Sequence, residues 1–312
     1  MKRLAVLDDY DGSIAKLKCW QKLAGIFEIS FFNALKSGHD LKDFDAVVLL
    51  RERTVFNRET ILACKNLKHI ALTGRLSGQA DFKTLKEKAI SASYTAGSGS
   101  APAELTIGLL IEAAKKISHH DRVMRKGGWH SEPARNLAGK TLGVLGLGRI
   151  GTKVTQFAKL MDMNVVSWGL TPDGGRSEKL GISRVSLEEC LSSSDFICIC
   201  LRLSDSTRGL LGKAELSSIK NGATLINTAR AEIVTKEALY AELSSERISA
   251  CLDVHYEEPL PHADPLRQLP NVVLSPHMGY VTAEVYDLFY GQVVENLFNW
   301  NHGRPFNDAL NG

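Results

Sequence analysis

The sequence lacks any apolar run near the 18–20 residues that a membrane helix needs, and it has no marked excess of either charge. Its 312 residues hold 38 Lys and Arg against 35 Asp and Glu, a formal net charge of +3. Neither nucleic acid nor an anionic membrane surface is therefore expected as the main partner. Near the amino terminus, Asp8 and Asp9 interrupt the apolar stretch Leu4–Leu7 too early for a secretory signal. We expect a soluble protein that acts in the cytoplasm.

Cysteine is scarce, and its spacing does not suit metal or redox chemistry. None of the six cysteines forms a C-x-x-C pair. Only Cys198 and Cys200 are close, and in a strand both would point to the same face. The sequence therefore predicts reduced, buried thiols and no metal site.

Short apolar runs alternate with amphipathic stretches along the chain, whose 44% hydrophobic and 23% charged residues are ordinary globular usage. Strands separated by helices imply parallel pairing through right-handed crossovers, and the length suits two domains. The sequence therefore predicts an α/β fold with two doubly wound parallel-sheet domains. The expected strands are Arg3–Leu7, Asp45–Leu50, Lys68–Thr73 and Ser91–Thr95, then Lys140–Gly146, Asn164–Trp168, Asp195–Leu201, Gly222–Asn227, Ile248–Val254 and Asn271–Ser275.

The boundary between the two series is marked by the small and polar residues Gly97–Ser100. A long helix is expected next, with Ser100 as its N-cap and Gly127-Gly128 at its end. The last helical pattern, about Thr282–His302, follows the completed second sheet, so it can return to the first domain. This predicts a discontinuous first domain of residues 1–99 and 283–312, and a second domain of residues 100–282.

A glycine-rich loop follows the strand Lys140–Gly146. Gly146, Gly148 and Gly151 have the G-x-G-x-x-G spacing, and the helix they open is amphipathic. In such a loop the glycines permit a tight turn, close approach to a pyrophosphate and close strand–helix packing. Arg149 and Ile150 would offer backbone N–H groups at the positive end of the helix. The pattern predicts a dinucleotide-binding domain.

The acidic residue that holds the ribose hydroxyls of NAD is missing from its usual place. It is expected roughly 20 positions after the loop, where this chain has Gly169, and the nearest carboxylate is Asp173. Without that negative charge a 2′-phosphate can be accepted, with help from Thr171, Arg176 or Arg202. We therefore expect NADP or NAD, with NADP slightly favoured.

Three further residues follow predicted strands, where open α/β sheets place their chemistry. Arg230 offers a planar fork that grips a carboxylate, and His277 is suited to exchange a proton near neutral pH. Glu258 can fix the tautomer of that histidine and stabilise its protonated form. Taken singly, a helix cap, a surface acid and a loop histidine explain them as well.

With these residues in place, the chain resembles the D-isomer-specific 2-hydroxyacid dehydrogenases over nearly its whole length. The matching segments are RERTVF (51–56), APAELTIGLLIEAAKKI (101–117), LAGKTLGVLGLGRIG (137–151), STRGLLG (206–212), INTAR (226–230), LDVHYEEP (252–259) and SPHMGY (275–280). The resemblance implies a Rossmann cofactor domain plus a flavodoxin-like substrate domain, and a homodimer formed through the cofactor domain. The implied activity is hydride transfer between a nicotinamide and a small 2-keto or 2-hydroxy acid.

The resemblance also assigns roles to individual residues. It implies that Arg230 binds the substrate and that His277, partnered by Glu258, donates or accepts the proton. Arg51 and the backbone N–H groups of Arg75 and Leu76 would line the substrate side. The implied cofactor contacts are Gly146, Gly148, Arg149, Ile150, Gly151, Gly169, Arg202, Thr228 and Asp253, with Asp253 facing the nicotinamide.

The chain departs from the family pattern at Gly169, where Asp is common, and at Cys200 and Arg202, where His and Pro are frequent. Arg75 and Leu76 are bulkier than usual, and Ala231-Glu232 follows Arg230 where Gly-Gly is usual. Cofactor choice and substrate identity therefore stay open. The alternative function is a nucleotide-sensing binding protein or corepressor on the same fold, for which an interaction tail is expected. Formate oxidation would need an additional Asn and a longer amino-terminal region.

Overall fold

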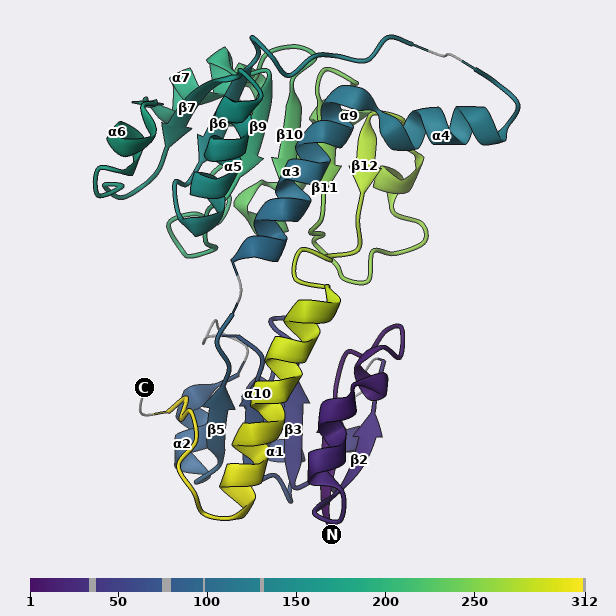
Figure 1. Ribbon diagram of the computed structural model, residues 1–312, viewed down its shortest axis with the longest axis vertical. Helices are drawn as coiled ribbons and strands as arrows, with labels where there is room; N and C mark the ends of the chain where they lie inside the picture. The colour runs from purple at the N-terminus through teal and green to yellow at the C-terminus, as the bar shows by residue number, and fades with distance from the viewer. Residues whose placement is uncertain (34–37, 75–79, 98, 130–131, 311–312) are drawn as a thin grey trace. The chain divides into compact units, whose positions relative to one another are not determined.

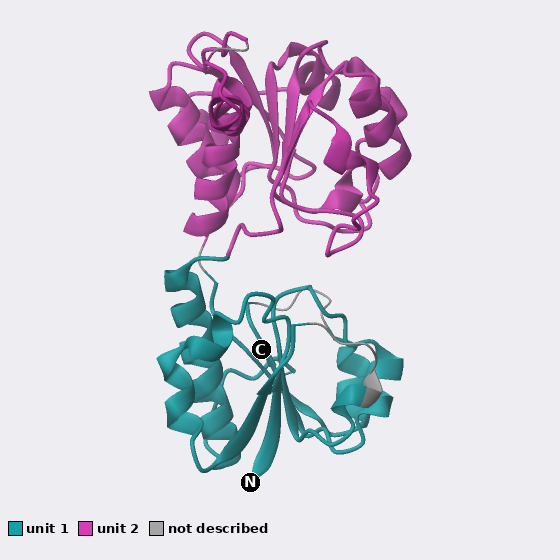
Figure 2. Ribbon diagram, turned by 90° about the vertical axis from the view of Figure 1, so that its right-hand side faces the viewer, with its two compact units in different colours: residues 1–98, 281–312 teal, residues 99–280 magenta. Residues whose placement is uncertain are grey.

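The computed structural model describes residues 1–33, 38–74, 80–97, 99–129 and 132–310. The chain forms two compact units, which are coloured separately in Figure 2. Unit 1 consists of residues 1–98 and 281–312, and unit 2 of residues 99–280. These bounds differ by one or two residues from the division expected from the sequence. Residues Arg75 and Leu76, expected near the substrate, lie outside the described ranges.

Unit 1 is built on a parallel sheet with the strand order β2-β1-β3-β4-β5. Helix α10 returns to this sheet from the far end of the chain and packs against β4, β5 and η2 (Figure 1). The strands are β1 (Lys2–Val6), β2 (Phe27–Phe31), β3 (Ala46–Leu49), β4 (His69–Leu72) and β5 (Ser91–Tyr94). The helices are η1 (Ile14–Lys16), η2 (Lys18–Leu23), η3 (Gly38–Leu41), α1 (Arg58–Ala63), α2 (Phe82–Glu87) and α10 (Ala283–Asn301).

Unit 2 is built on a second parallel sheet, with the strand order β12-β11-β10-β9-β6-β7-β8. The strand order reverses between β6 and β9, and in sheets of this kind ligands bind at the carboxyl ends beside that point. The strands are β6 (Thr141–Leu145), β7 (Asn164–Trp168), β8 (Ser183–Arg184), β9 (Phe196–Ile199), β10 (Thr224–Asn227), β11 (Ser249–Leu252) and β12 (Val272–Leu274).

Helices cover both faces of the second sheet (Figure 1). Helices α3 and α5 pack on one face, over a core that includes Leu110, Val154 and Phe196, and α7, α8 and α9 close the other. The helices are α3 (Ser100–Lys115), α4 (Ile117–Arg125), α5 (Arg149–Leu160), α6 (Arg176–Leu180), α7 (Leu187–Ser193), α8 (Lys213–Ser218), η4 (Ala231–Ile233), α9 (Lys236–Ser244) and η5 (Pro265–Gln268). No helix in the described ranges combines the length and apolarity needed to cross a bilayer.

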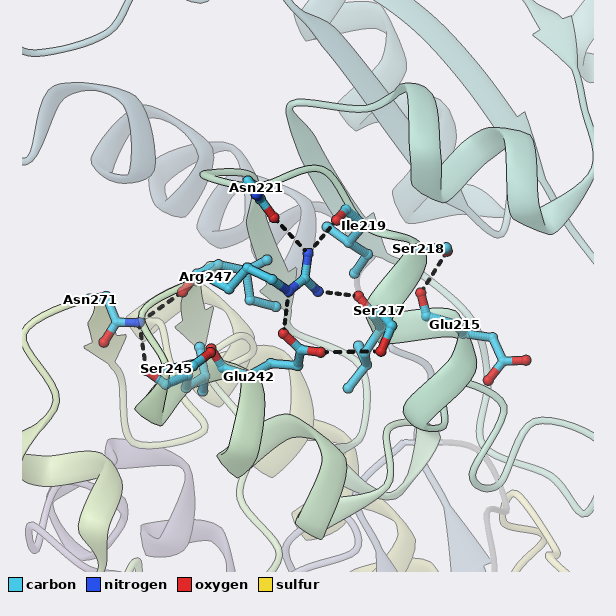
Figure 3. A network of polar contacts seen from close by, with 12 residues as sticks. Glu215, Ser217, Ser218, Ile219, Asn221, Glu242, Ser245, Arg247 and Asn271 are labelled. Carbon is cyan, nitrogen blue, oxygen red and sulfur yellow. Dashed lines mark hydrogen bonds and ion pairs between the residues drawn. The ribbon is translucent and has the colours of Figure 1, made fainter.

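A guanidinium joins the helices on that second face (Figure 3). Arg247 donates to the carbonyl oxygens of Leu216 and Ile219, each at 2.5 Å, and to Glu242 at 2.5 Å. Leu216 O also accepts from Ile219 N–H at 3.1 Å, and Ile219 lies just past the last residue of α8, where the helix supplies no further donor. Arg247 therefore ties the end of α8 to α9.

The predicted fold class, two parallel-sheet α/β domains, is confirmed, but several elements differ. The spacing of Ile14, Leu17, Trp20 and Leu23 predicts one amphipathic helix, but this segment forms two 3-10 helices. The edge strands β2, with one buried residue, and β8, with none, were not predicted. The prediction of a single long helix from Ser100 to Gly127-Gly128 is wrong as well. Lys116 adopts a left-handed backbone conformation (φ +51°), which ends α3 and starts α4. Gly99, and not Ser100, is the N-cap of α3.

Candidate active site

The glycine loop lies between β6 and α5, at the carboxyl edge of the unit 2 sheet. Gly146 has φ +99°, and a Cβ there would lie 2.9 Å from the carbonyl oxygen of Cys200. A Cβ on Gly151 would lie 2.2 Å from the carbonyl oxygen of Gly146, whereas none of the described atoms lies within 4 Å of one on Gly148. Gly146 and Gly151 are thus required because a side chain would collide with the backbone, whereas Gly148 leaves open space above the loop.

The amino end of α5 faces that open space. Gly148 is its N-cap and has no side chain to accept from the first-turn N–H groups. The first intrahelical bond runs from Thr152 N–H to Gly148 O at 2.9 Å, so the amides of Arg149 and Ile150 have no acceptor within the helix. These amides and the helix dipole make a site suited to a phosphate.

A cleft of about 410 Å³ continues from the loop along the ends of β7 and β9. Its lining includes Gly169, Thr171 and three arginines, Arg176, Arg184 and Arg202. Arg176 Nε donates to the carbonyl oxygen of Leu147 at 2.7 Å, and Arg184 Nη2 to that of Gly169 at 2.6 Å. Three arginines therefore line the cleft that contains Gly169, and one of them, Arg184, is bonded to the Gly169 carbonyl.

Asp173, the one carboxylate among the described residues of this lining, is committed to local hydrogen bonds. Its Oδ1 accepts from Gly175 N–H and its Oδ2 from Ser177 N–H, both at 3.0 Å. Hydrogen bonds from Ser177, and then from Gly175, hold the pKa of this carboxyl below its usual value. Asp173 therefore stabilises the start of α6.

His277 and Glu258 form a hydrogen-bonded pair beyond the ends of β12 and β11. His277 Nδ1 lies 2.6 Å from Glu258 Oε2, and the two side chains are 13% and 24% exposed. Because a carboxylate only accepts, Nδ1 carries the proton and Nε2 is the second exchangeable position. The arrangement is that of a histidine oriented by an acid, as general acid–base chemistry requires.

Asp253 lies beneath the loop that carries His277. Its side chain is buried, and its Oδ1 accepts from Ser275 Oγ at 2.6 Å and from Met278 N–H at 2.9 Å. Its Oδ2 accepts from Gly279 N–H at 3.0 Å. The carboxylate that was expected to face the nicotinamide is thus bonded to the Ser275 hydroxyl before His277 and to the Met278 and Gly279 backbone after it.

Arg230 follows β10 and is held by its neighbours in an extended conformation (φ −146°). Asn227 Nδ2 donates to the carbonyl oxygen of Arg230 at 3.0 Å, and Asn227 Oδ1 accepts from Ala229 N–H at 3.0 Å. Thr228 Oγ1 lies 2.7 Å from Thr106 Oγ1 of α3. The short turn after β10 is therefore fixed by side chains as well as by the backbone.

Arg51 belongs to unit 1, at the end of β3, where it has φ +51° and donates its backbone N–H to Thr73 Oγ1 at 2.9 Å. Its guanidinium lies directly over Gly74, since a Cβ there would be 1.9 Å from Arg51 Nη1. Gly74 thus makes room for the arginine that the sequence places on the substrate side.

In unit 2 the structure brings together the glycine loop, Gly169 and Arg202 around one cleft, and His277 with Glu258 in one pair. Sequence reasoning missed Arg184 and His255; the latter donates to the carbonyl oxygen of Ser275. Arg184 belongs to no matching segment, and His255 lies in LDVHYEEP (252–259), where no role was assigned to it. Among the side chains that the structure describes, no three His, Cys, Asp or Glu are grouped as metal ligands would be.

Comparison with known proteins gives consistent matches. Residues 107–279 match the model of the NAD binding domain of D-isomer specific 2-hydroxyacid dehydrogenases. D-3-phosphoglycerate dehydrogenase of Archaeoglobus fulgidus is 33% identical over 277 residues, which cover 87% of this chain but only 52% of that protein, so the chain spans about half of its length. Hydroxypyruvate reductase of Thermotoga maritima is 34% identical, covering 81% of this chain and 83% of that protein. The crystal structure of a phosphoglycerate oxidoreductase from Vibrio cholerae has a TM-score of 0.92 at 33% identity, covering 97% of this chain and 100% of that chain.

Proposed function

Because the chain belongs to the D-isomer specific 2-hydroxyacid dehydrogenase family, we propose that it is a cytoplasmic oxidoreductase that interconverts a small 2-keto acid and its D-2-hydroxy acid. The observation that carries the proposal is the 2.6 Å contact between His277 and Glu258, in the same unit as a glycine loop open to a dinucleotide. The relatives named as hydroxypyruvate reductase and phosphoglycerate dehydrogenase support a 2-keto or 2-hydroxy acid as the substrate class.

The residues of unit 2 fit a nicotinamide dinucleotide. The space above Gly148 and the amides of Arg149 and Ile150 would hold the pyrophosphate, with Gly146 and Gly151 shaping the loop. Thr228 and Asp253 would lie at the nicotinamide side. When bound in its reduced form, this cofactor supplies the hydride.

The adenosine side of the cleft favours NADP over NAD. Gly169 offers no carboxylate to a ribose diol, and Asp173 is engaged at the start of α6. Arg184 and Arg202 add positive charge to the lining, which suits a 2′-phosphate.

Three side chains of unit 2 would act on the substrate. Arg230 would hold its carboxylate and keto oxygen, since a planar guanidinium makes two parallel hydrogen bonds. His277 Nε2 would donate a proton to the keto oxygen in the reductive direction and remove it in the oxidative one. The Glu258 carboxylate, bound at Nδ1, would stabilise the protonated imidazole.

We also propose that the protein is a homodimer formed through unit 2. Helix α4 supports this proposal, because none of its residues is buried and Ile117 and Met124 are exposed on it. Trp129, in the segment that follows, is 70% exposed. Light scattering after gel filtration should give twice the 34.2 kDa chain mass, and a monomer mass would contradict this arrangement.

The function is tested with purified protein, NADPH or NADH, and a panel of 2-keto acids that includes glyoxylate and hydroxypyruvate. His277→Ala should reduce kcat by roughly 10²–10⁴-fold while the dissociation constant of the cofactor stays within about twofold. His262→Ala, which removes an exposed histidine from the same unit, is the matched control and should keep full activity. An unchanged rate in His277→Ala would remove this histidine from the mechanism, and no turnover on any acid would favour a sensing protein.

A further inference from the structure

Among the side chains between Asp253 and Pro259 that the proposed reaction does not use are His255 and Tyr256. The ring of His255 is directed at the loop that bears His277, since its Nε2 lies 2.9 Å from the carbonyl oxygen of Ser275. Its backbone N–H donates to Glu258 Oε1 at 2.9 Å. One residue therefore contacts the segments on both sides of the His277–Glu258 pair.

These contacts fix the state of the His255 ring. A carbonyl oxygen only accepts, so Nε2 carries the proton. Nδ1 is buried and has no hydrogen-bond partner among the residues that the structure describes. The bond to the Ser275 carbonyl oxygen is thus the one described polar contact of this ring. Through it the ring holds the backbone two residues before His277.

The two oxygens of Glu258 are divided between the same two histidines. Oε1 accepts from the His255 backbone and Oε2 from His277 Nδ1. Rotation of the Glu258 carboxylate would break one of these two bonds. The His255 backbone N–H therefore helps to set the orientation of the carboxylate. Asp253 holds the far side of the loop through Met278 and Gly279 N–H.

We propose that His255 is a positioning residue that sets the orientation of His277 relative to Glu258. This inference rests on the proposed function. A shift in the backbone at Ser275 would carry the imidazole out of line with both the carboxylate and the substrate. Because general acid catalysis depends on that alignment, the proton-transfer step should be more sensitive than cofactor binding.

Tyr256, the next residue, contacts the segment that follows Arg230. Its hydroxyl donates to the carbonyl oxygen of Val234 at 2.8 Å. Val234 closes η4, and Arg230 is the N-cap of that helix. Tyr256→Phe should therefore disturb the carboxylate grip of Arg230 and raise KM for the keto acid by about threefold to tenfold, with a smaller change in kcat.

The test compares His255→Phe, which keeps a ring but has no donor, with His255→Gln, whose amide can still donate to Ser275. His255→Phe should lower kcat about tenfold with the cofactor dissociation constant within twofold, and His255→Gln should recover to within about threefold of wild type. Ser186→Ala is the matched control: it removes the N-cap of α7, bonded to Glu189 N–H at 3.1 Å, and should lower Tm without changing kcat.

A double-mutant cycle separates positioning from general loss of stability. If His255 acts by aligning His277 with Glu258, His255→Phe should cost less than about threefold in a Glu258→Gln background. Equal losses in both backgrounds, or an unchanged kcat in His255→Phe, would overturn the inference while leaving the proposed function intact. A wild-type protein inactive on every keto acid would overturn both.

Discussion

Substituting Asp for Gly169 should change the preferred cofactor from NADPH to NADH. Gly169 follows β7, and its backbone is outside the left-handed region that favours glycine. The atom nearest to a new Cβ would be the carbonyl oxygen of Thr171 at 3.9 Å, an ordinary contact. The substitution therefore adds a negative charge to the cleft without steric strain.

The size of the effect follows from the charges around this position. Two unit charges in contact interact by about 1 kcal/mol in bulk water and about 4 kcal/mol near a protein surface. A 2′-phosphate carries a charge of about −1.5 to −2, so the new carboxylate should weaken NADPH binding by about 2 kcal/mol. Hydrogen bonds from the ribose hydroxyls of NADH should add about 1 kcal/mol. The ratio of kcat/KM values should then change by about 10²-fold.

The assay measures kcat/KM and the dissociation constant for both reduced cofactors. Gly169→Asn is the matched control, because it has nearly the same shape as the Asp variant without the charge, and it should leave NADPH binding within about threefold. Arg184→Gln and Arg202→Gln should each weaken NADPH by about fivefold, about 1 kcal/mol, and change NADH little.

One pattern of results would refute this account. Asp173 could supply the ribose carboxylate only by giving up its bonds to Gly175 and Ser177 N–H. If the wild type strongly preferred NADH, Asp173→Ala abolished that preference, and Gly169→Asp had no effect, the arginines would not set cofactor choice.

Three further substitutions test the site and the fold. Arg230→Lys keeps the charge but loses the planar fork, so kcat/KM should fall well below wild type, and a value within about twofold in steady-state assays would exclude Arg230 as the anchor. Burial lowers the pKa of His69 from 6.5 to about 3. As the pH falls below about 6.5 the unfolded chain binds the proton first, so the free energy of unfolding should drop by up to about 1.4 kcal/mol per pH unit. Urea titrations at pH 7 and pH 4.5 should show that this loss is absent in His69→Phe. Arg247→Met removes the charged donor that joins Glu242 to the Leu216 and Ile219 carbonyls and should cost about 2–4 kcal/mol by urea titration, whereas Arg125→Met, which removes an exposed pair, should cost less than about 1 kcal/mol.

The strands that could be predicted from the sequence are those that are buried along their length, because full burial requires a continuous run of apolar residues. Strand β9 (Phe196–Ile199) is buried along its whole length and was predicted within a few residues. Strand β2 (Phe27–Phe31) pairs on one side alone, and Phe27 is its one buried residue, so its sequence FEISF resembles many surface segments. The break at Lys116 has no Gly or Pro to mark it, because a lysine supplies the left-handed residue.

The same distinction applies to the candidate site. A side chain that grips a carboxylate or exchanges a proton must be of a particular chemical type at the end of a strand, so Arg230 and His277 stand out in the sequence. A residue that positions others through a carbonyl oxygen needs only a donor at the right distance, as His255 has toward Ser275. Many residue types meet that requirement, so the sequence alone does not reveal it.

The proposed preference for NADP rests on both kinds of residue. The absence of an acid at residue 169 can be inferred from the sequence. One helix and one strand separate the glycine loop from this position, so the number of residues between them is nearly fixed. Part of the positive charge near residue 169 comes from Arg184, which lies on the two-residue edge strand β8. Its guanidinium is held beside residue 169 by the bond to the Gly169 carbonyl. The register of β8 with β7 places Arg184 beside the end of β7, since Ser167 pairs with Arg184. A carboxylate introduced at residue 169 would meet this guanidinium as well as the ribose, so Arg184→Gln combined with Gly169→Asp should give a larger preference for NADH than either change alone.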